Sequence, residues 1–247
     1  MASIPGGQYS FFAAGQAVNV VTTADGTNLP PPIGGEFNLE VVTSPQGTSY
    51  SLPLGYQGVA LLSDQGHALN MLTGDYAVWA NGHGPDTIQA GSGNDTIFGL
   101  TGHDLITGGS GPDVIYGGRH DTIQGGTGPD TIYGGAGHEL ITGGSGNNLI
   151  VGGSGHETID GGAGNNMIQV GSGHTLIQDN GVTGHDTVVG FDTAHGDKIG
   201  FEGENKSSID NIVATANENG GNTTISLPDG STMTLVGITH IDHTFFH

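Results

Sequence analysis

The sequence predicts an all-β protein whose central part winds as a right-handed solenoid of two parallel sheets, flanked by smaller β segments. Three observations lead to this prediction. Glycine supplies 49 of the 247 residues, and from residue 81 a glycine-rich turn returns about every nine residues. Each nine-residue unit carries an isoleucine at its eighth position and a polar residue two positions earlier. Repeats of this kind stack coil on coil and bury a core that no single unit could form.

The repeat follows the pattern G-G-x-G-x-D-x-U-x, where U is a large aliphatic residue. Eleven units run from Asn81 to Gln178, and a looser twelfth, NGVTGHDTVV, ends at Val189. The unit GGRHDTIQ has eight residues because its fourth-position glycine is missing, so we expect an altered turn there. The eighth position holds Ile88, Ile97, Ile106, Ile115, Ile123, Ile132, Ile141, Ile150, Ile159, Ile168 and Ile177.

Each unit is expected to contribute one short strand and one sharp turn. A three-residue strand, x-U-x, sends only its middle side chain to one face, so every unit adds one isoleucine to a thin column. The glycines supply the positive φ angles that a sharp turn needs. Two units complete one coil, which places alternate units about 4.8 Å apart. We call the two sheets and their turns odd and even, after the numbering of the units. Because one aliphatic layer is thin, something must also bind the turns.

The sixth position of the repeat is the candidate for binding. On the odd edge it holds Asp86, Asp104, Asp121, Glu139, Glu157 and Thr175. On the even edge it holds Asp95, Asp113, Asp130, Asn148, Asn166 and, in the looser unit, Asp186. Carboxylates stacked at strand spacing repel one another unless a cation lies between them, and hard oxygen ligands suit Ca²⁺. A single aspartate is as readily explained by capping of its own turn, but a row at a fixed offset favours the ion.

These units resemble the RTX (haemolysin-type) calcium-binding nonapeptide repeats, which form a calcium-loaded parallel β-roll. The resemblance covers residues 81–178 unit by unit. It implies that Ca²⁺ lies between a turn and the next turn on the same edge, held by sixth-position aspartates and turn carbonyls. The implied sites join Asp86 with Asp104, Asp104 with Asp121, Asp95 with Asp113, and Asp113 with Asp130.

The second half of the repeat array departs from the family pattern. The asparagines keep an oxygen but lose the charge, the glutamates are one methylene longer, and Thr175 is a weak ligand. We therefore expect Ca²⁺ to bind most tightly in the first half. Weaker sites are expected at Glu139, Asn148, Glu157, Asn166 and Asp186.

The fifth position of the odd units carries a second pattern. It holds a row of histidines, namely His103, His120, His138, His156 and His174. One interpretation is a solvent-facing position where histidine has no role. A second is a pH-sensitive ladder, because neighbouring imidazolium charges at ~5 Å repel by roughly 0.8 kcal/mol in water. A third is a softer metal such as Zn²⁺ or Ni²⁺ on paired imidazoles.

The seventh and ninth positions point outward and give the two sheets different faces. The odd face is rich in Thr and Gln, loosely like flat ice-binding faces, but Leu105 and Leu140 interrupt it. The even face is apolar, and an exposed apolar face of this size is unusual for a monomer. We therefore expect it to be covered by another part of the chain or by another protein, most simply a second copy. The residues of this expected interface are Phe98, Val114, Tyr116, Tyr133, Leu149 and Val151.

The flanks are expected to cap the roll, because an open solenoid end exposes strand edges. Residues 1–54 contain strand-like runs and predict a small N-terminal β appendage. Residues 55–80 predict degenerate capping turns, with Trp79 closing the end of the isoleucine column. The roll itself is assigned to residues 81–186. Residues 187–247 predict a β cap with a hairpin across Asp229 and Gly230, and they resemble the C-terminal region of RTX proteins, which carries an uncleaved type I secretion signal.

The composition of the chain excludes several classes of partner and site. Three basic residues against 24 acidic ones give a formal charge of −21, which argues against nucleic acid or an anionic membrane and for cations. The absence of cysteine excludes disulfides, thiolate metal sites and cysteine nucleophiles. No apolar run reaches the roughly 20 residues of a membrane span, and the start of the chain lacks the features of a signal peptide. Motifs of metalloproteases, serine hydrolases and P-loop enzymes are missing, so we expect no enzyme.

Two non-enzymatic functions fit these features. In the first, a secreted calcium-binding protein folds on Ca²⁺ outside the cell and self-associates as a filament, surface layer or biofilm matrix. In the second, it is a calcium-dependent adhesin that recognises a surface or glycan through residues 1–54. A minor alternative is the non-catalytic RTX part of an exported enzyme. Export through the type I secretion apparatus to the outside or surface of a Gram-negative bacterium is what the resemblance implies.

Overall fold

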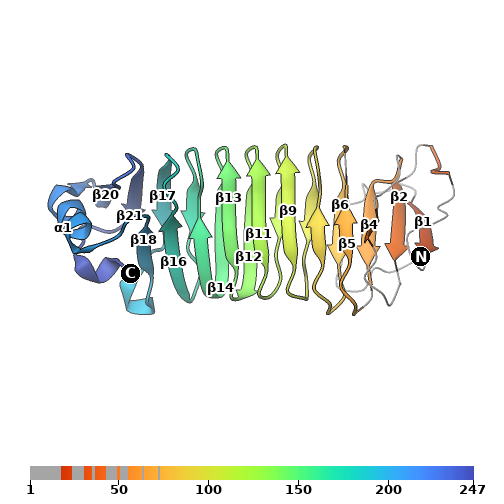
Figure 1. Ribbon diagram of the computed structural model, residues 1–247, viewed down its shortest axis with the longest axis horizontal. Helices are drawn as coiled ribbons and strands as arrows, with labels where there is room; N and C mark the ends of the chain where they lie inside the picture. The colour runs from red at the N-terminus through yellow and green to blue at the C-terminus, as the bar shows by residue number, and fades with distance from the viewer. Residues whose placement is uncertain are drawn as a thin grey trace.

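The computed structural model describes residues 18–23, 31–34, 37–42, 49–50, 55–62, 64–71 and 73–247. The chain forms an elongated stack of coils whose strands run across the long axis, with the N-terminal strands at one end and the C-terminal elements at the other (Figure 1). The architecture is a parallel β-roll of about eight turns. The predicted all-β solenoid is therefore confirmed.

Two sheets run the length of the roll. The even sheet contains, in spatial order, β1 (Val18–Thr23), β2 (Phe37–Val42), β4 (Gly58–Leu61), β6 (Ala77–Ala80), β8 (Thr96–Phe98), β10 (Val114–Tyr116), β12 (Thr131–Gly137), the first part of β14 (Leu149–Asp160), β15 (Met167–Gln169), β17 (His185–Val189) and β21 (Thr232–Val236). The odd sheet contains β3 (Ser49–Tyr50), β5 (Ala68–Asn70), β7 (Thr87–Gln89), β9 (Leu105–Ser110), β11 (Thr122–Thr127), β13 (Leu140–Ser145), the last part of β14, β16 (His174–Asp179) and β18 (Lys198–Phe201).

The register between coils follows the repeat. Ile115 of β10 lies opposite Ile97 of β8 and Ile132 of β12, so alternate units stack. The same holds in the odd sheet, where each isoleucine lies opposite the next one on its own side. All eleven eighth-position isoleucines are at most 1% exposed. They form one column between the two sheets, as the period of two along each strand requires.

The position of Trp79 differs from the expectation. Val78, not Trp79, stands opposite Ile97 and continues the buried column. Since neighbouring residues of a strand point to opposite faces, Trp79 lies on the outer face of the even sheet. There its ring stacks on Phe98 with a centroid separation of 6.1 Å. The prediction that Trp79 closes the end of the column is therefore wrong.

The described strands before residue 55 extend the roll. β2 pairs in parallel with both β1 and β4, and β3 pairs in parallel with β5. The N-terminal β segment expected before the roll is thus continuous with its two sheets. The remainder of the expected appendage lies outside the described residues, and the expected boundaries after residues 54, 80 and 186 stay predictions.

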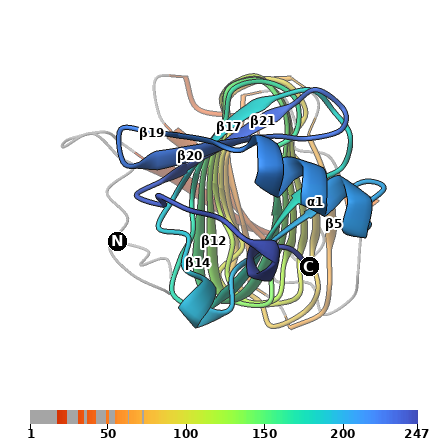
Figure 2. The same ribbon diagram turned by 90° about the vertical axis from the view of Figure 1, so that its left-hand side faces the viewer.

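The C-terminal end of the stack is covered by a mixed cap (Figure 2). The predicted hairpin is present, with β20 (Asn222–Ser226) antiparallel to both β21 and β19 (Asn217–Asn219). The cap also contains the helix α1 (Lys206–Thr215), which begins with a capping box at Asn205 and buries Ile212. Two 3₁₀ turns, η1 (Thr193–His195) and η2 (His243–Phe245), complete it. No helix in the part of the chain that the structure describes is long and apolar enough to cross a membrane.

Candidate metal centre

The sixth-position residues form two buried ladders, one on each edge of the roll. In the odd ladder the Oδ1 atom of Asp104 accepts the backbone N–H of Asp86 at 2.8 Å, and the Oδ1 of Asp121 accepts that of Asp104 at 2.8 Å. In the even ladder Asp113 and Asp130 accept from the sixth residue of the preceding coil in the same way, at 2.8 and 2.9 Å. All six sixth-position aspartates of the first half are 1–2% exposed. One carboxylate oxygen of each residue is thus fixed by the coil before it.

The second carboxylate oxygen is the unusual feature of these ladders. It is buried and makes no hydrogen bond, among the described residues, in Asp86, Asp95, Asp104, Asp113 and Asp130. A buried polar atom without a partner costs roughly 1–3 kcal/mol, and more when it is charged. Native folds keep only a few such atoms, so a row of five at equivalent positions of the repeat calls for a ligand. Asp121 differs, because its Oδ2 accepts the N–H of Gly118 at 2.6 Å.

The glycines of the turns leave room beside these oxygens. A Cβ atom on Gly108 would lie 2.5 Å from Oδ2 of Asp113 and 2.6 Å from the carbonyl oxygen of Gly125. A Cβ atom on Gly125 would likewise lie 2.5 Å from Oδ2 of Asp130 and 2.4 Å from the carbonyl oxygen of Gly143. Carboxylate and carbonyl oxygens therefore border the same small spaces. Oxygen donors of these two kinds are the ligands that Ca²⁺ takes in proteins.

Without an ion, these carboxyl groups resist ionisation. Burial, with a smaller contribution from the charges of Asp121 and Asp86, raises the pKa of Asp104 to about 8. Burial also raises the pKa of Asp95 to about 7 and that of Asp130 to about 6. Asp104 and, in part, Asp95 therefore hold protons near neutral pH, and a cation must displace those protons to bind.

The repeats that form these ladders match a known family. Residues 82–174 match the family model of the RTX calcium-binding nonapeptide repeat, in the overlapping segments 82–115, 98–120, 116–150, 134–168 and 151–174. This part of the chain is an array of RTX calcium-binding repeats. A comparison with curated proteins found no match. The oxygens without partners and the glycine-lined spaces fit the ion for which these repeats are named.

The even ladder of the RTX array continues with amides in its second half. The Oδ1 of Asn148 accepts the N–H of Asp130 at 2.9 Å, and that of Asn166 accepts the N–H of Asn148 at 2.9 Å. The Nδ2 of Asn166 donates to the carbonyl oxygen of Gly162 and to Oδ1 of Asp186. An N–H₂ group thus points where the first half presents a charged oxygen, and an N–H₂ group cannot ligate Ca²⁺. Burial also raises the pKa of Asp186, the last member of this ladder, to about 6.

The odd ladder changes through its glutamates. The longer side chain of Glu139 reaches the backbone N–H of His120 at 2.9 Å, and Oε2 of Glu157 accepts the hydroxyl of Thr175 at 3.2 Å. One oxygen of each glutamate, Oε2 of Glu139 and Oε1 of Glu157, stays buried with no hydrogen bond in the described part of the chain. The carboxylates are retained here, but their positions differ from those of the aspartates.

Two members of the odd ladder were missed by sequence reasoning. His67 stands before Asp86 and contacts its Oδ1 through both its backbone N–H (2.7 Å) and its Nδ1 (3.0 Å). Asp197 stands after Thr175 and accepts its N–H at 2.9 Å. The tetrapeptide Asp197–Gly200, DKIG, fits the D-x-U-x half of the repeat and was the available signal. No comparable signal marks His67.

The five fifth-position histidines form one stacked row. Their ring centroids are separated by 5.0, 5.3, 4.7 and 4.7 Å from His103 to His174, and all five side chains are exposed. His120, in the eight-residue unit, adopts φ of +62°, as the missing glycine of that turn requires. The altered turn expected for this unit is therefore present.

The outer face of the even sheet is partly covered by the chain itself. The rings of Trp79, Phe98, Tyr116 and Tyr133 stack in one column, the last two pairs at 4.8 Å. Phe98 is only 2% exposed, and it belongs to a buried cluster with Trp79. Phe98 therefore does not belong to an open interface, contrary to expectation. The side chains of this expected interface that remain partly exposed are Val114, Tyr116, Tyr133, Leu149 and Val151.

Proposed function

We propose that this chain is a secreted calcium-binding structural protein whose roll folds when Ca²⁺ enters its turns outside the cell. The observation that carries the proposal is the row of buried carboxylate oxygens without partners beside glycine carbonyls. The expected ligands are Asp86, Asp95, Asp104, Asp113 and Asp130, together with turn carbonyls. Asp121 is expected to ligate only if the ion displaces the N–H of Gly118 from its Oδ2. Where Ca²⁺ is scarce, as in a cytosol, the stacked acids oppose folding. Where Ca²⁺ is abundant, the free energy of binding becomes free energy of folding.

This coupling suits export in an unfolded state. A chain that stays unfolded at low Ca²⁺ can pass through a type I secretion apparatus, which is the route associated with RTX repeats. The large negative charge supports the same view, because self-repulsion destabilises a compact state until cations bind.

Far-ultraviolet circular dichroism during a Ca²⁺ titration tests the coupling. We expect little β signal in EDTA and a cooperative gain of β signal as Ca²⁺ rises, reversed by chelator. A roll whose spectrum is the same in EDTA and in millimolar Ca²⁺ would refute the proposal. Mg²⁺ at the same concentration is the control, because its smaller, octahedral site is a poor match to flexible oxygen-lined turns.

We also propose that copies of the protein associate through the outer face of the even sheet. The partly exposed strip of Val114, Tyr116, Tyr133, Leu149 and Val151 carries no charged side chain, so two copies could meet there without bringing acids together. Bound Ca²⁺ would also reduce the excess negative charge that keeps copies apart. The C-terminal end of the roll is covered by α1 and the hairpin (Figure 2). This cover favours association through the face of the even sheet over end-to-end stacking of rolls.

Analytical ultracentrifugation in Ca²⁺ tests this second step. The double variant Tyr116→Lys with Tyr133→Lys should dissociate the assembly. The matched control Thr107→Lys with Gln124→Lys adds the same charge to the odd face of the same coils and should leave it intact. A wild-type protein that sediments only as a monomer in millimolar Ca²⁺ would remove self-association while leaving calcium-coupled folding in place.

A further inference from the structure

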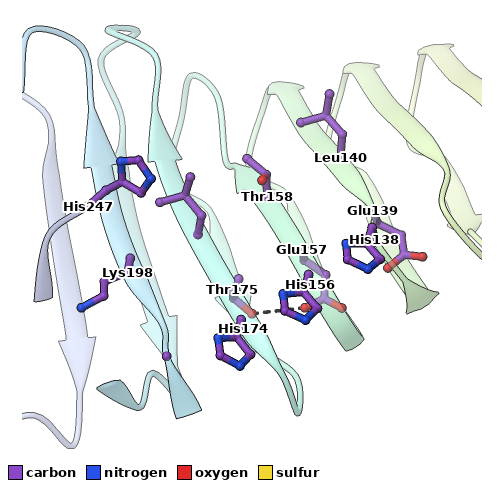
Figure 3. A pocket seen from close by; sticks show the side chains of 12 residues that line it. His138, Glu139, Leu140, His156, Glu157, Thr158, His174, Thr175, Lys198 and His247 are labelled. Carbon is purple, nitrogen blue, oxygen red and sulfur yellow. Dashed lines mark hydrogen bonds between the residues drawn. The ribbon is translucent and has the colours of Figure 1, made fainter. Parts of the chain in front are cut away.

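A groove runs along the odd edge in the second half of the roll (Figure 3). It has a volume of about 620 Å³ and is bordered by four successive coils and by His247 of the C-terminal tail. His138, His156 and His174 line it from consecutive turns, with Glu139 and Glu157 beside them. This is the part of the odd edge where glutamate replaces aspartate, so the groove brings imidazoles and carboxylates together where the RTX pattern is weakest.

One pair of histidines in the groove is especially well aligned. The rings of His138 and His156 lie 4.7 Å apart between centroids, with only 4° between their planes. No ring nitrogen of either residue makes a hydrogen bond to another described residue, and both side chains are exposed. The imidazole nitrogens are therefore available as ligands on two neighbouring strands.

Glu157 supplies a carboxylate to the same place. It borders the same groove as His138, which lies one coil earlier. Glu157 is 2% exposed, and its Oε1 lies buried with no hydrogen bond among the described residues, while Oε2 is held by Thr175. A buried carboxylate oxygen without a partner, next to two available imidazoles, is a donor set that an ion would complete.

The first half of the odd edge offers a direct comparison. His103, His120 and Asp121 occupy the same three repeat positions. Both carboxylate oxygens of Asp121 are already engaged, by Asp104 and by Gly118. The two rings are also farther apart, 5.0 Å, and inclined by 16°. The same residue types are present, but the open carboxylate oxygen is missing.

We propose that His138, His156 and Glu157 form a site for a divalent transition-metal ion of the Zn²⁺ class, distinct from the calcium-binding turns. Imidazole nitrogen and carboxylate oxygen suit Zn²⁺, with bonds of about 2.0–2.2 Å, whereas Ca²⁺ takes oxygen ligands. No three His, Asp or Glu side chains of the described ranges already surround a common point. The exposed rings must therefore tilt toward each other, until their nitrogens are no more than about 4 Å apart. Rotation about the bond to an imidazole ring is soft, so this costs little.

The test uses the full chain folded in saturating Ca²⁺, with Co²⁺ as the spectroscopic probe. We expect visible absorption of Co²⁺ in a nitrogen- and oxygen-ligated site, displaced by Zn²⁺ and not by further Ca²⁺. His138→Ala with His156→Ala should lower the affinity at least tenfold, and Glu157→Gln should lower it by about tenfold. The control His103→Ala with His120→Ala should leave the affinity within twofold of wild type. Circular dichroism in Ca²⁺ reports whether each variant keeps the roll.

Several results would overturn this site. Unchanged Co²⁺ affinity in the His138 and His156 double variant is one, and an equal loss in the control pair is another. Displacement of Co²⁺ by millimolar Ca²⁺ would assign the ion to the turns instead. If a variant fails to fold, X-ray absorption at the zinc edge of the wild-type protein decides the question. Two imidazole ligands support the site, and a spectrum with oxygen ligands alone contradicts it. None of these results depends on self-association.

Discussion

Exchanging one aspartate and one asparagine of the even ladder gives a matched pair of perturbations. Asp113→Asn keeps an oxygen that can accept the N–H of Asp95, a hydrogen bond of 2.8 Å. It replaces the buried, unpartnered Oδ2 with an N–H₂ group in the same glycine-lined space, as Asn148 already does two coils later. The ladder should therefore survive while a charged ligand is lost. Asn148→Asp makes the reverse change at the same repeat position, where Nδ2 has no partner in the described part of the protein.

The expected magnitude follows from the role of the lost oxygen. Removal even of a group that supports a metal ligand costs about 10- to 100-fold in affinity, so loss of a ligand should cost at least tenfold, or about 1.4 kcal/mol. We expect Asp113→Asn to raise the Ca²⁺ concentration at the midpoint of folding by at least tenfold. Asn148→Asp should lower it, because it restores a charged oxygen beside Gly143.

The assay is the Ca²⁺ titration followed by circular dichroism, run on wild type and both variants at one pH and ionic strength. Opposite shifts of the midpoint are the signature of ligation. If both exchanges shift the midpoint in the same direction, or if Asp113→Asn leaves it unchanged, Oδ2 is not a calcium ligand and the argument from buried oxygens fails.

Two further predictions address the space and the protons in the turns. Gly125→Ala would place a Cβ atom 2.4 Å from the carbonyl oxygen of Gly143. We therefore expect it to lower the free energy of unfolding by about 1–3 kcal/mol and to raise the Ca²⁺ concentration at the midpoint of folding. In the control Gly34→Ala the new Cβ has no atom within 4 Å, so neither quantity should change. Burial raises the pKa of Asp104 to about 8 and that of Asp95 to about 7 in the ion-free roll, above the usual value of about 4. The ion-free roll should therefore be most stable below about pH 4 and lose stability as the pH rises toward 8. Ca²⁺ affinity should rise over the same range, because protons compete with the ion. Titrations at about pH 6 and pH 8 that give the same Ca²⁺ midpoint would contradict this linkage.

The repeat made most of the fold predictable from sequence. A period of nine with one buried isoleucine per unit fixes which side chain enters the column, and stacking of alternate units follows from two units per coil. Ile115 opposite Ile97 and Ile132 is the direct consequence. The position of the sixth residue on the edge follows from the same period. The sequence alone therefore places Asp104 and Asp113 in ladders.

The features that escaped prediction are those outside the strict period. The strand-like run around Trp79 did not show which face of the sheet its side chain points to. The register of Val78 with Ile97 decides this, because it places Trp79 on the outer face. The burial of Phe98 in a cluster with Trp79 involves residues before the repeat array, so the repeat alone could not predict it. The helix α1 lies in a tail with no repeat, and it begins with a capping box at Asn205. The engaged Oδ2 of Asp121 arises from the short unit, whose altered turn brings the N–H of Gly118 within reach.

A crystal structure of the protein grown in Ca²⁺ tests the central claim most directly. The account predicts an ion about 2.3–2.6 Å from Oδ2 of Asp113, with turn carbonyls completing its coordination, and the same arrangement at Asp104. An anomalous difference map identifies the element. Turns that contain only water at these two aspartates, in a protein folded in millimolar Ca²⁺, would contradict it.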